Sequence, residues 1–215
     1  GDSQDSARYS YDLVIEDGAG NEEKNQFNAR TAYTFEHDEH HTTEVGVSLQ
    51  YGQVHNVFKD SWGARYAAAV HLNETYKRWN VMLQVLHYEY WLDNPPGRDE
   101  SFVVMGAYDF AYRVAAEASI YTAGLSYTLP VDWPVLDSIT FYNDYSYMDK
   151  AQSDYGDSQQ NVLGASIAAG NFFIYCDIAS GKNHPWLGPH WTEGLAAGGN
   201  TGWHTRFNMN VGFYF

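Results

Sequence analysis

The sequence predicts an all-β fold, an antiparallel transmembrane β-barrel, and three observations lead to it. Apolar and polar residues alternate along the chain, the composition is rich in aromatic residues, and the chain ends in a strand pattern. The 215 residues include 18 Tyr, 11 Phe and 7 Trp, and only 18% are charged, below the roughly 25% of soluble domains. Tyr, Thr, Ser, Asn and Gly favour strands and turns. The length indicates one domain, residues 1–215.

Alternation with a period of two is the main strand signal. It is clearest at the C-terminus, where every second residue from Phe207 to Phe215 is apolar. Strict alternation also predicts strands over 27–35, 45–51 and 121–129. Weaker alternation adds seven segments, for eleven in all: Tyr9–Ile15, Ala64–Leu72, Trp79–Tyr90, Phe102–Asp109, Ile139–Tyr147, Asn161–Ala168 and Phe172–Ile178. The stretches between strands are rich in turn residues: Glu16–Glu23, His37–His41, Asp93–Glu100, Asp149–Gln159 and Gly181–Gly202.

The number of strands decides whether such a barrel closes by itself. Bacterial barrels made of one chain have an even number of strands, which eleven segments do not supply. Either Tyr108–Ala118 contains a second turn and strand, or a first strand lies outside the sequence. A barrel that closes by itself would then have about twelve strands. Otherwise the chain forms part of a larger barrel.

The two faces of the predicted strands fit lipid on one side and water on the other. One face is apolar, whereas the other carries Gly, Ser, Asn and isolated charges, and the chain has only five Lys. The mean hydropathy of −0.48 fits this, because barrel strands alternate apolar and polar residues. The residues expected to line the pore are Arg8, Asp12, Arg30, Glu44, Arg65, Asp109, Asp144, Asp177, Arg206, Asn208 and Asn210. Since carboxylates slightly outnumber arginines among them, a weak preference for cations is a hypothesis.

Charge and composition exclude several classes of protein. The net charge of −15 argues against nucleic acid, which needs a basic face. Cys176 is the single cysteine, so no disulfide forms within the chain. No stretch approaches the roughly 20 apolar residues of a membrane helix. The polar start, Gly1–Asp5, shows no signal peptide, so an outer-membrane protein would be present here in mature or trimmed form.

Four C-terminal segments resemble the closing strands of porins of the phosphate-selective (O and P) superfamily: FYNDYS at 141–146, DSQQN at 157–161, GKNHPWLG at 181–188 and TRFNMNVGFYF at 205–215. The resemblance covers residues 119–215 and implies the C-terminal half of a larger porin barrel in a bacterial outer membrane. It also implies that Phe215 is the assembly signal read by the barrel-assembly machinery. Members of that family are much longer, and their basic lumen ladder is not matched here. Phosphate selectivity is therefore not carried over.

The resemblance implies a porin-type channel of a Gram-negative outer membrane, for passive diffusion of small hydrophilic solutes or ions. Its partners would be lipid and solutes, and a homotrimer would be compatible with the odd strand count. A non-conducting barrel that acts as an anchor or partner-binding sleeve is the alternative. We expect no enzyme. A barrel hydrolase would have to combine His71 or His87 with Ser48, Ser126 or Ser166, and no nucleophile stands out.

Two further segments carry candidate chemistry. The cluster His37–His41 offers imidazoles and carboxylates that suit Zn²⁺ or Cu²⁺, but five consecutive polar residues also suit a solvated loop. We expect that loop, with no metal and no cofactor. The last connection, Gly181–Gly202, either packs on itself or folds inward to narrow the pore. His184, Trp186 and Trp191 are the constriction candidates, with rings on which a sugar could stack.

Overall fold

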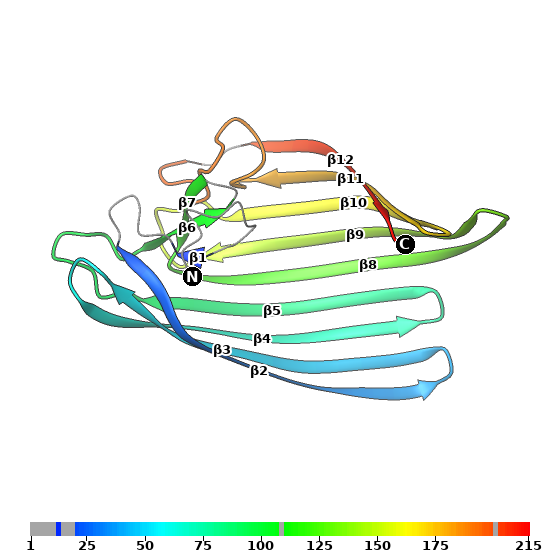
Figure 1. The fold of residues 1–215 in the computed structure, drawn as a ribbon, viewed down its shortest axis with the longest axis horizontal. Coiled ribbons are helices and arrows are strands. Elements are labelled where there is room, and N and C mark those ends of the chain that lie inside the picture. Colours follow the sequence, from blue (N-terminus) through cyan, green and yellow to red (C-terminus); the bar gives the residue numbers. More distant parts are fainter. Residues whose placement is uncertain (1–11, 14–19, 108–109, 200–201) are drawn as a thin grey trace.

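The computed structural model describes residues 12–13, 20–107, 110–199 and 202–215. In this part of the chain all regular structure is β, with antiparallel pairing and no helix, as predicted (Figure 1). Three of the described strands are short: β1 (Asp12–Leu13), β6 (Phe102–Ala107) and β7 (Phe110–Ala115). The long strands are β2 (Asn21–Asp38), β3 (His41–Asn56), β4 (Ser61–Tyr76), β5 (Trp79–Trp91), β8 (Glu117–Trp133), β9 (Leu136–Lys150), β10 (Ser158–Ala169), β11 (Phe172–Lys182) and β12 (Trp203–Phe213).

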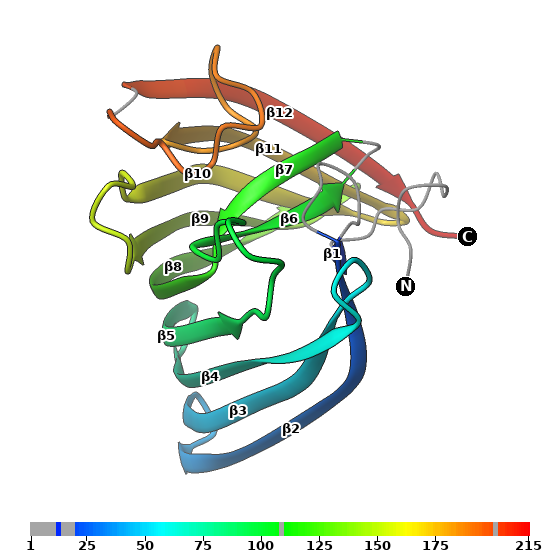
Figure 2. The same cartoon turned by 90° about the vertical axis from the view of Figure 1, so that its left-hand side faces the viewer.

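The nine long strands form one curved sheet in the order β12-β11-β10-β9-β8-β5-β4-β3-β2. Figure 2 shows that the sheet bends into a trough. In the described residues the sheet ends at β2 and at β12, so the wall is open rather than a closed barrel of twelve strands. The expected second strand after Tyr108 exists as β7, but β1, β6 and β7 form a separate small sheet and add nothing to the wall.

The connections at the two ends of the sheet differ in length. At one end, the right side of Figure 1, consecutive strands are joined by two residues each, at 39–40, 77–78, 134–135 and 170–171. The left-handed backbone at Lys77 (φ 57°) and Gly170 (φ 54°) is of the kind that such tight turns need. The other end carries the longer connections 57–60, 92–116, 151–157 and 183–202. We call these the short-turn end and the long-loop end.

The β6–β7 hairpin folds back into the trough at the long-loop end (Figure 2). Its Val103 is fully buried together with Leu13 of β1 and Val54 of β3. Tyr90 of β5 packs against this cluster, and the Tyr90 amide donates to the Ala116 carbonyl at 2.8 Å. We call the face of the wall that the hairpin covers the concave face, and the opposite one the outer face.

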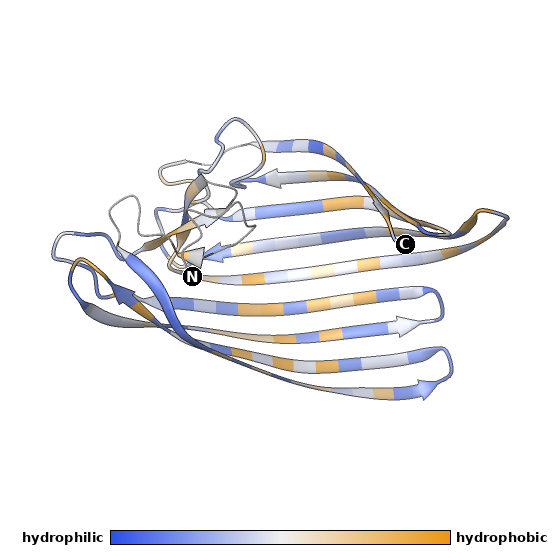
Figure 3. Cartoon of the chain, in the orientation of Figure 1, coloured by the Kyte–Doolittle hydropathy of each residue, from blue (hydrophilic) through white to orange (hydrophobic). Residues whose placement is uncertain are grey.

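The predicted alternation of the wall strands is confirmed, and Figure 3 shows it as alternating hydropathy bands. Along β3, Val45, Val47, Leu49 and Tyr51 are exposed on the outer face, whereas the residues between them point to the concave face. Exposure remains high across the sheet, at 54% for Leu49 and 65% for Phe207. No helix in the described residues has the length and hydropathy of a membrane span.

Candidate functional site

A charged triad occupies the concave face of β2, β3 and β4. The Arg30 Nη2 atom lies 2.9 Å from the Glu44 Oε1 atom, and the His71 Nε2 atom lies 3.0 Å from the same oxygen. Gly46 lies directly opposite His71 in the strand register, and a Cβ atom there would be 2.3 Å from the imidazole. The missing side chain therefore lets His71 lie flat against the wall, where the triad compensates its own charge.

A second polar cluster lies near the other edge of the wall, on β9, β11 and β12. The Tyr142 hydroxyl donates to Asp177 Oδ2 at 3.2 Å, and Asn208 Nδ2 donates to Asp177 Oδ1 at 2.8 Å. Gly164 lies opposite both Tyr142 and Asp177. A Cβ atom on Gly164 would be 2.6 Å from the Tyr142 hydroxyl oxygen. Both oxygens of the Asp177 carboxylate are thus occupied by donors from the wall itself.

Between these clusters runs a groove of about 510 Å³ on the concave face. Its polar lining includes Arg30, Glu44, Asn73, Gln84, Thr122 and Asp144. Three of these residues were expected to line a pore from the sequence. Besides neutral amide and hydroxyl groups, the lining includes His71 and the apolar side chains of Leu72, Met82 and Leu83.

The other residues singled out from the sequence have different positions. Arg65 lies on the concave face but is buried at 7% exposure, where Glu23, Gln26 and Tyr90 accept its hydrogen bonds. It joins β4 to β2 and β5 and is not among the residues that line the groove. Arg206 and Asn210 share a strand face with Asn208 at the β12 edge. Three of the expected residues lie outside the residues or side chains that the structure describes: Arg8, Asp12 and Asp109.

The long connection 183–202 packs on the β6–β7 hairpin. The ring of Trp186 lies 5.0 Å from that of Tyr112 and 5.1 Å from that of Trp191, both edge-on. At the end of β9, the Lys150 ammonium donates to the carbonyls of Gly194 at 2.6 Å and Leu195 at 3.2 Å. The loop therefore contacts both the hairpin and the end of β9 in addition to its own residues. It joins the hairpin across the long-loop end.

His184 lies within this loop, and its surroundings favour the neutral form of the imidazole. Burial, and then the nearby positive charge of Arg206, lower the pKa of His184 below its ordinary value of 6.5. The Trp186 amide donates to His184 Nδ1 at 3.2 Å, which requires an unprotonated Nδ1. A cavity of about 210 Å³ lies between the hairpin, this loop and the wall, and its lining includes Tyr112, Ile120, Met148, Lys150, Gln160 and His184.

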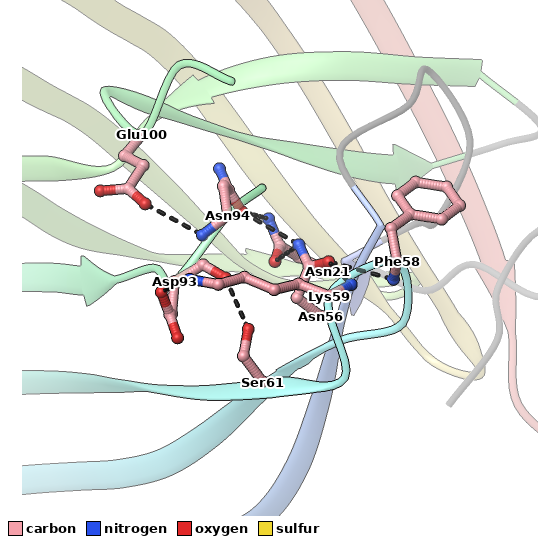
Figure 4. Close-up of polar contacts among 8 residues, drawn as sticks. All are labelled: Asn21, Asn56, Phe58, Lys59, Ser61, Asp93, Asn94 and Glu100. Atoms are coloured by element: carbon pink, nitrogen blue, oxygen red, sulfur yellow. Dashed lines mark hydrogen bonds and ion pairs between the residues drawn. The ribbon is translucent and has the colours of Figure 1, made fainter. Parts of the chain in front are cut away.

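Three buried asparagines tie the long-loop end together (Figure 4). Asn56 Nδ2 donates to Asn21 Oδ1 at 2.9 Å and to Asn94 Oδ1 at 3.1 Å, and Asn21 Nδ2 donates to Asn94 Oδ1 at 2.9 Å. The backbone amide of Asn94 in turn donates to Glu100 Oε1 at 2.9 Å. Beside them, the Lys59 ammonium lowers the pKa of the Asp93 carboxyl. The sequence did not predict this network, because asparagine between strands usually marks a solvated turn.

The outer face carries an unexpected polar cluster on β5 and β8. His87 Nδ1 lies 3.1 Å from Ser119 Oγ, and His87 Nε2 lies 3.9 Å from Glu117 Oε1. Three possible ligand atoms lie within 4.8 Å of one another, one each from His87, Glu89 and Glu117. At this spacing they could hold a metal ion. The only signal for this in the sequence is the placement of charge at strand positions that should be apolar.

The His37–His41 segment is largely exposed, as expected of a solvated segment, but its connection is shorter than expected. Only Glu39 and His40 connect the strands, and the residues beside them belong to β2 and β3. His37 Nε2 lies 2.9 Å from Thr43 Oγ1, whereas His41 bonds Glu74. Among the described residues, these side chains do not form a group of three potential metal ligands.

No protein-family model, curated protein or solved structure matches this chain significantly. The resemblance of residues 119–215 to phosphate-selective porins therefore stays a prediction from the sequence. What the fold and the site define is an open, antiparallel β-wall with an apolar outer face and a polar concave face.

Proposed function

We propose that this chain forms part of the wall of a porin-type β-barrel in a bacterial outer membrane, through which small hydrophilic solutes or ions diffuse passively. The observation that carries the proposal is the exposure of large apolar side chains on the outer face of every wall strand from β2 to β12. Soluble monomers rarely expose contiguous apolar patches beyond a few hundred Å². Lipid is the partner that suits such a face, with a polar lumen behind it.

The two ends of the sheet support an orientation. Outer-membrane barrels have short periplasmic turns and longer extracellular loops. The two-residue connections lie at the end where β12 finishes, and the four longer connections lie at the other. This arrangement supports a periplasmic C-terminus, where Phe215 would act as the signal for the barrel-assembly machinery.

The open edges call for further strands. In lipid an unpaired strand edge leaves its amides without partners, so a spanning sheet must close. Successive wall strands are antiparallel from β12 to β2, so with nine strands both edge strands run in the same direction. If the barrel closes with antiparallel pairs alone, the number of additional strands must be odd. The total number of strands is then even, as in bacterial barrels made of one chain. We propose a larger barrel on this ground.

The hairpin and the 183–202 connection narrow the mouth of this lumen. They meet inside the trough at the long-loop end through the Tyr112 and Trp186 rings and cover part of the concave face (Figure 2). Deletion of residues 186–198 is expected to raise single-channel conductance, because it removes Trp186 and Trp191 from the mouth. An unchanged conductance in a folded variant would argue against a constriction.

The test of the channel is direct. The purified protein in the form of the closed barrel that contains this wall, inserted into planar bilayers in KCl, is expected to give discrete conductance steps. A barrel that inserts into lipid vesicles but passes no current would instead support the anchor or partner-binding sleeve. Failure to insert into lipid at all would overturn the membrane assignment itself.

A barrel hydrolase is the second candidate, and the outer-face cluster favours it. Ser119 Oγ and His87 Nδ1 are within proton-transfer reach at 3.1 Å, and Glu117 lies on the other side of the imidazole. Ser119 is not one of the three serines that the sequence suggested as nucleophiles. Labelling by a fluorophosphonate probe that is lost in Ser119→Ala and retained in Ser126→Ala would support this activity. Absence of labelling in the lipid-reconstituted protein would exclude it.

A further inference from the structure

We propose that Asp144 is the group that gives the channel a preference for small monovalent cations, by direct contact with them in the groove. This inference rests on the proposed channel function and deepens it. It concerns three carboxylates on the concave face, Glu44, Asp144 and Asp177, which differ in what their oxygens bond.

Two of these three carboxylates are already occupied. Glu44 is paired with the Arg30 guanidinium at 2.9 Å and with His71 at 3.0 Å, so its charge is compensated within the wall. Asp177 accepts one hydrogen bond on each oxygen, from Tyr142 and from Asn208. A passing cation would have to displace these donors before it touched either carboxylate.

Asp144 has no such partners. It forms no hydrogen bond or ion pair with any residue that the structure describes, and it lines the groove between the other two clusters. Its side chain is half-buried against the wall, so part of its hydration is lost without compensation. A cation that enters the groove can supply that compensation.

Gly124 leaves the space on β8 that the Asp144 carboxylate occupies. The two residues lie directly opposite each other on β8 and β9, and a Cβ atom on Gly124 would be 2.6 Å from Asp144 Oδ1. That hypothetical atom would also be 3.2 Å from Met82 Cε. The carboxylate can therefore lie across β8 toward the middle of the groove only because residue 124 has no side chain.

The neighbouring groups suit a small cation. Asn73, Gln84 and Thr122 line the same groove, and the oxygens of their amide and hydroxyl groups carry lone pairs that can stabilise the charge of a cation held at the Asp144 carboxylate. Since the Arg30–Glu44 pair in the same groove compensates its own charge, Asp144 is left as a single uncompensated carboxylate, which fits a monovalent ion that must also leave. Conduction requires binding that is favourable but weak.

The test compares Asp144→Asn with Asp177→Asn, because both changes remove one negative charge from the same face. In planar bilayers under a KCl gradient, Asp144→Asn is expected to lower the permeability ratio of K⁺ to Cl⁻ about two- to threefold at low salt. Asp177→Asn should lower it less, since its oxygens are not free to contact the ion. An equal or larger effect of Asp177→Asn, or no effect of Asp144→Asn, would overturn the inference.

A second variant tests whether the position of the Asp144 carboxylate matters. Gly124→Ala keeps every charge but displaces the Asp144 carboxylate, so it should also change the K⁺ to Cl⁻ permeability ratio, whereas Ala32→Val on the same face should not. A wild-type protein that inserts but does not conduct would refute the channel proposal. A conducting wild type with an unchanged ratio in both Asp144→Asn and Gly124→Ala would refute only the role of Asp144.

Discussion

The two ends of the wall are built from the same kind of strand but differ in what holds them together. At the long-loop end, Leu13, Val54 and Val103 are at most 2% exposed, and Asn21 and Asn56 are equally buried. At the short-turn end, the side chains around the two-residue turns are open, as with Val135 at 73% exposure. Among the described residues, the most deeply buried side chains therefore gather at the long-loop end, where connections fold back into the trough. Identical substitutions at the two ends should reveal this difference.

The largest effect is expected from Asn56→Ala. This change removes the donor to Asn21 and Asn94 and also the acceptor of the Phe58 and Lys59 amides. Leaving several buried polar groups unpaired should lower the free energy of unfolding by about 3 kcal/mol. Denaturant titration of the reconstituted protein measures it.

Asn80→Ala is the matched control for Asn56→Ala. Asn80 also donates several hydrogen bonds, to Asn73, Glu74 and Thr75, but it lies beside a short turn and is partly exposed. Water can replace the lost bonds there, so a loss of about 1 kcal/mol or less is expected. Equal losses in the two variants would contradict the view that deep burial at the long-loop end sets the two ends apart.

Val103→Ala should have the next largest effect, because Val103 is fully buried between the hairpin and the wall. The loss of two methylene equivalents plus the cavity left behind should cost about 2 kcal/mol. Protease cleavage between β6 and β7 should accelerate in parallel. The same change at Val135, in a short turn, should alter the free energy of unfolding by less than about 0.5 kcal/mol, and a larger loss there would count against the comparison.

The same contrast explains what could be predicted from the sequence. The wall strands and their outer face follow from period-two alternation, as along 45–51 and 207–213, because each wall strand separates two different surroundings. The β6 strand departs from this pattern, because Phe102–Met105 are four consecutive apolar residues and the adjacent Val103 and Val104 are both buried. Such a run is consistent with a strand covered on both faces, but it does not indicate what covers the strand. The placement of the hairpin depends on the distant contact of Val103 with Val54 and Leu13.

The candidate site was predictable only in part, for a related reason. Period two assigns Arg30, Glu44 and Asp144 to one face, and they do lie together on the groove. It does not say which carboxylate is paired, since that depends on register: Glu44 meets an arginine across the strands, whereas Asp144 meets Gly124. Arg65 belongs to the same strand face but is buried by Glu23, Gln26 and Tyr90, which the sequence pattern does not indicate.

The smallest effect is expected from pH, and it should be confined to the long-loop end. The pKa of His184 is lowered by burial and by Arg206, so the folded loop favours the neutral ring, whereas the unfolded chain keeps the ordinary value of 6.5. Above that value the packing of the loop is fully stable, and it should weaken as the pH falls below 6.5. Hydrogen exchange of the Trp186 amide, which donates to His184 Nδ1, should reveal faster opening at pH 5 than at pH 7.5, after correction for the intrinsic rate.

His184→Gln separates this cause from other titrating groups. Glutamine retains an acceptor near the Trp186 amide but does not gain a proton, so its opening rate should be the same at both pH values after the same correction. An equal pH dependence in the variant would assign the effect to another group. Loss of protection at the 77–78 turn over the same pH range would contradict the comparison more deeply, because the acid-sensitive packing would then not be limited to the end where connections fold into the trough.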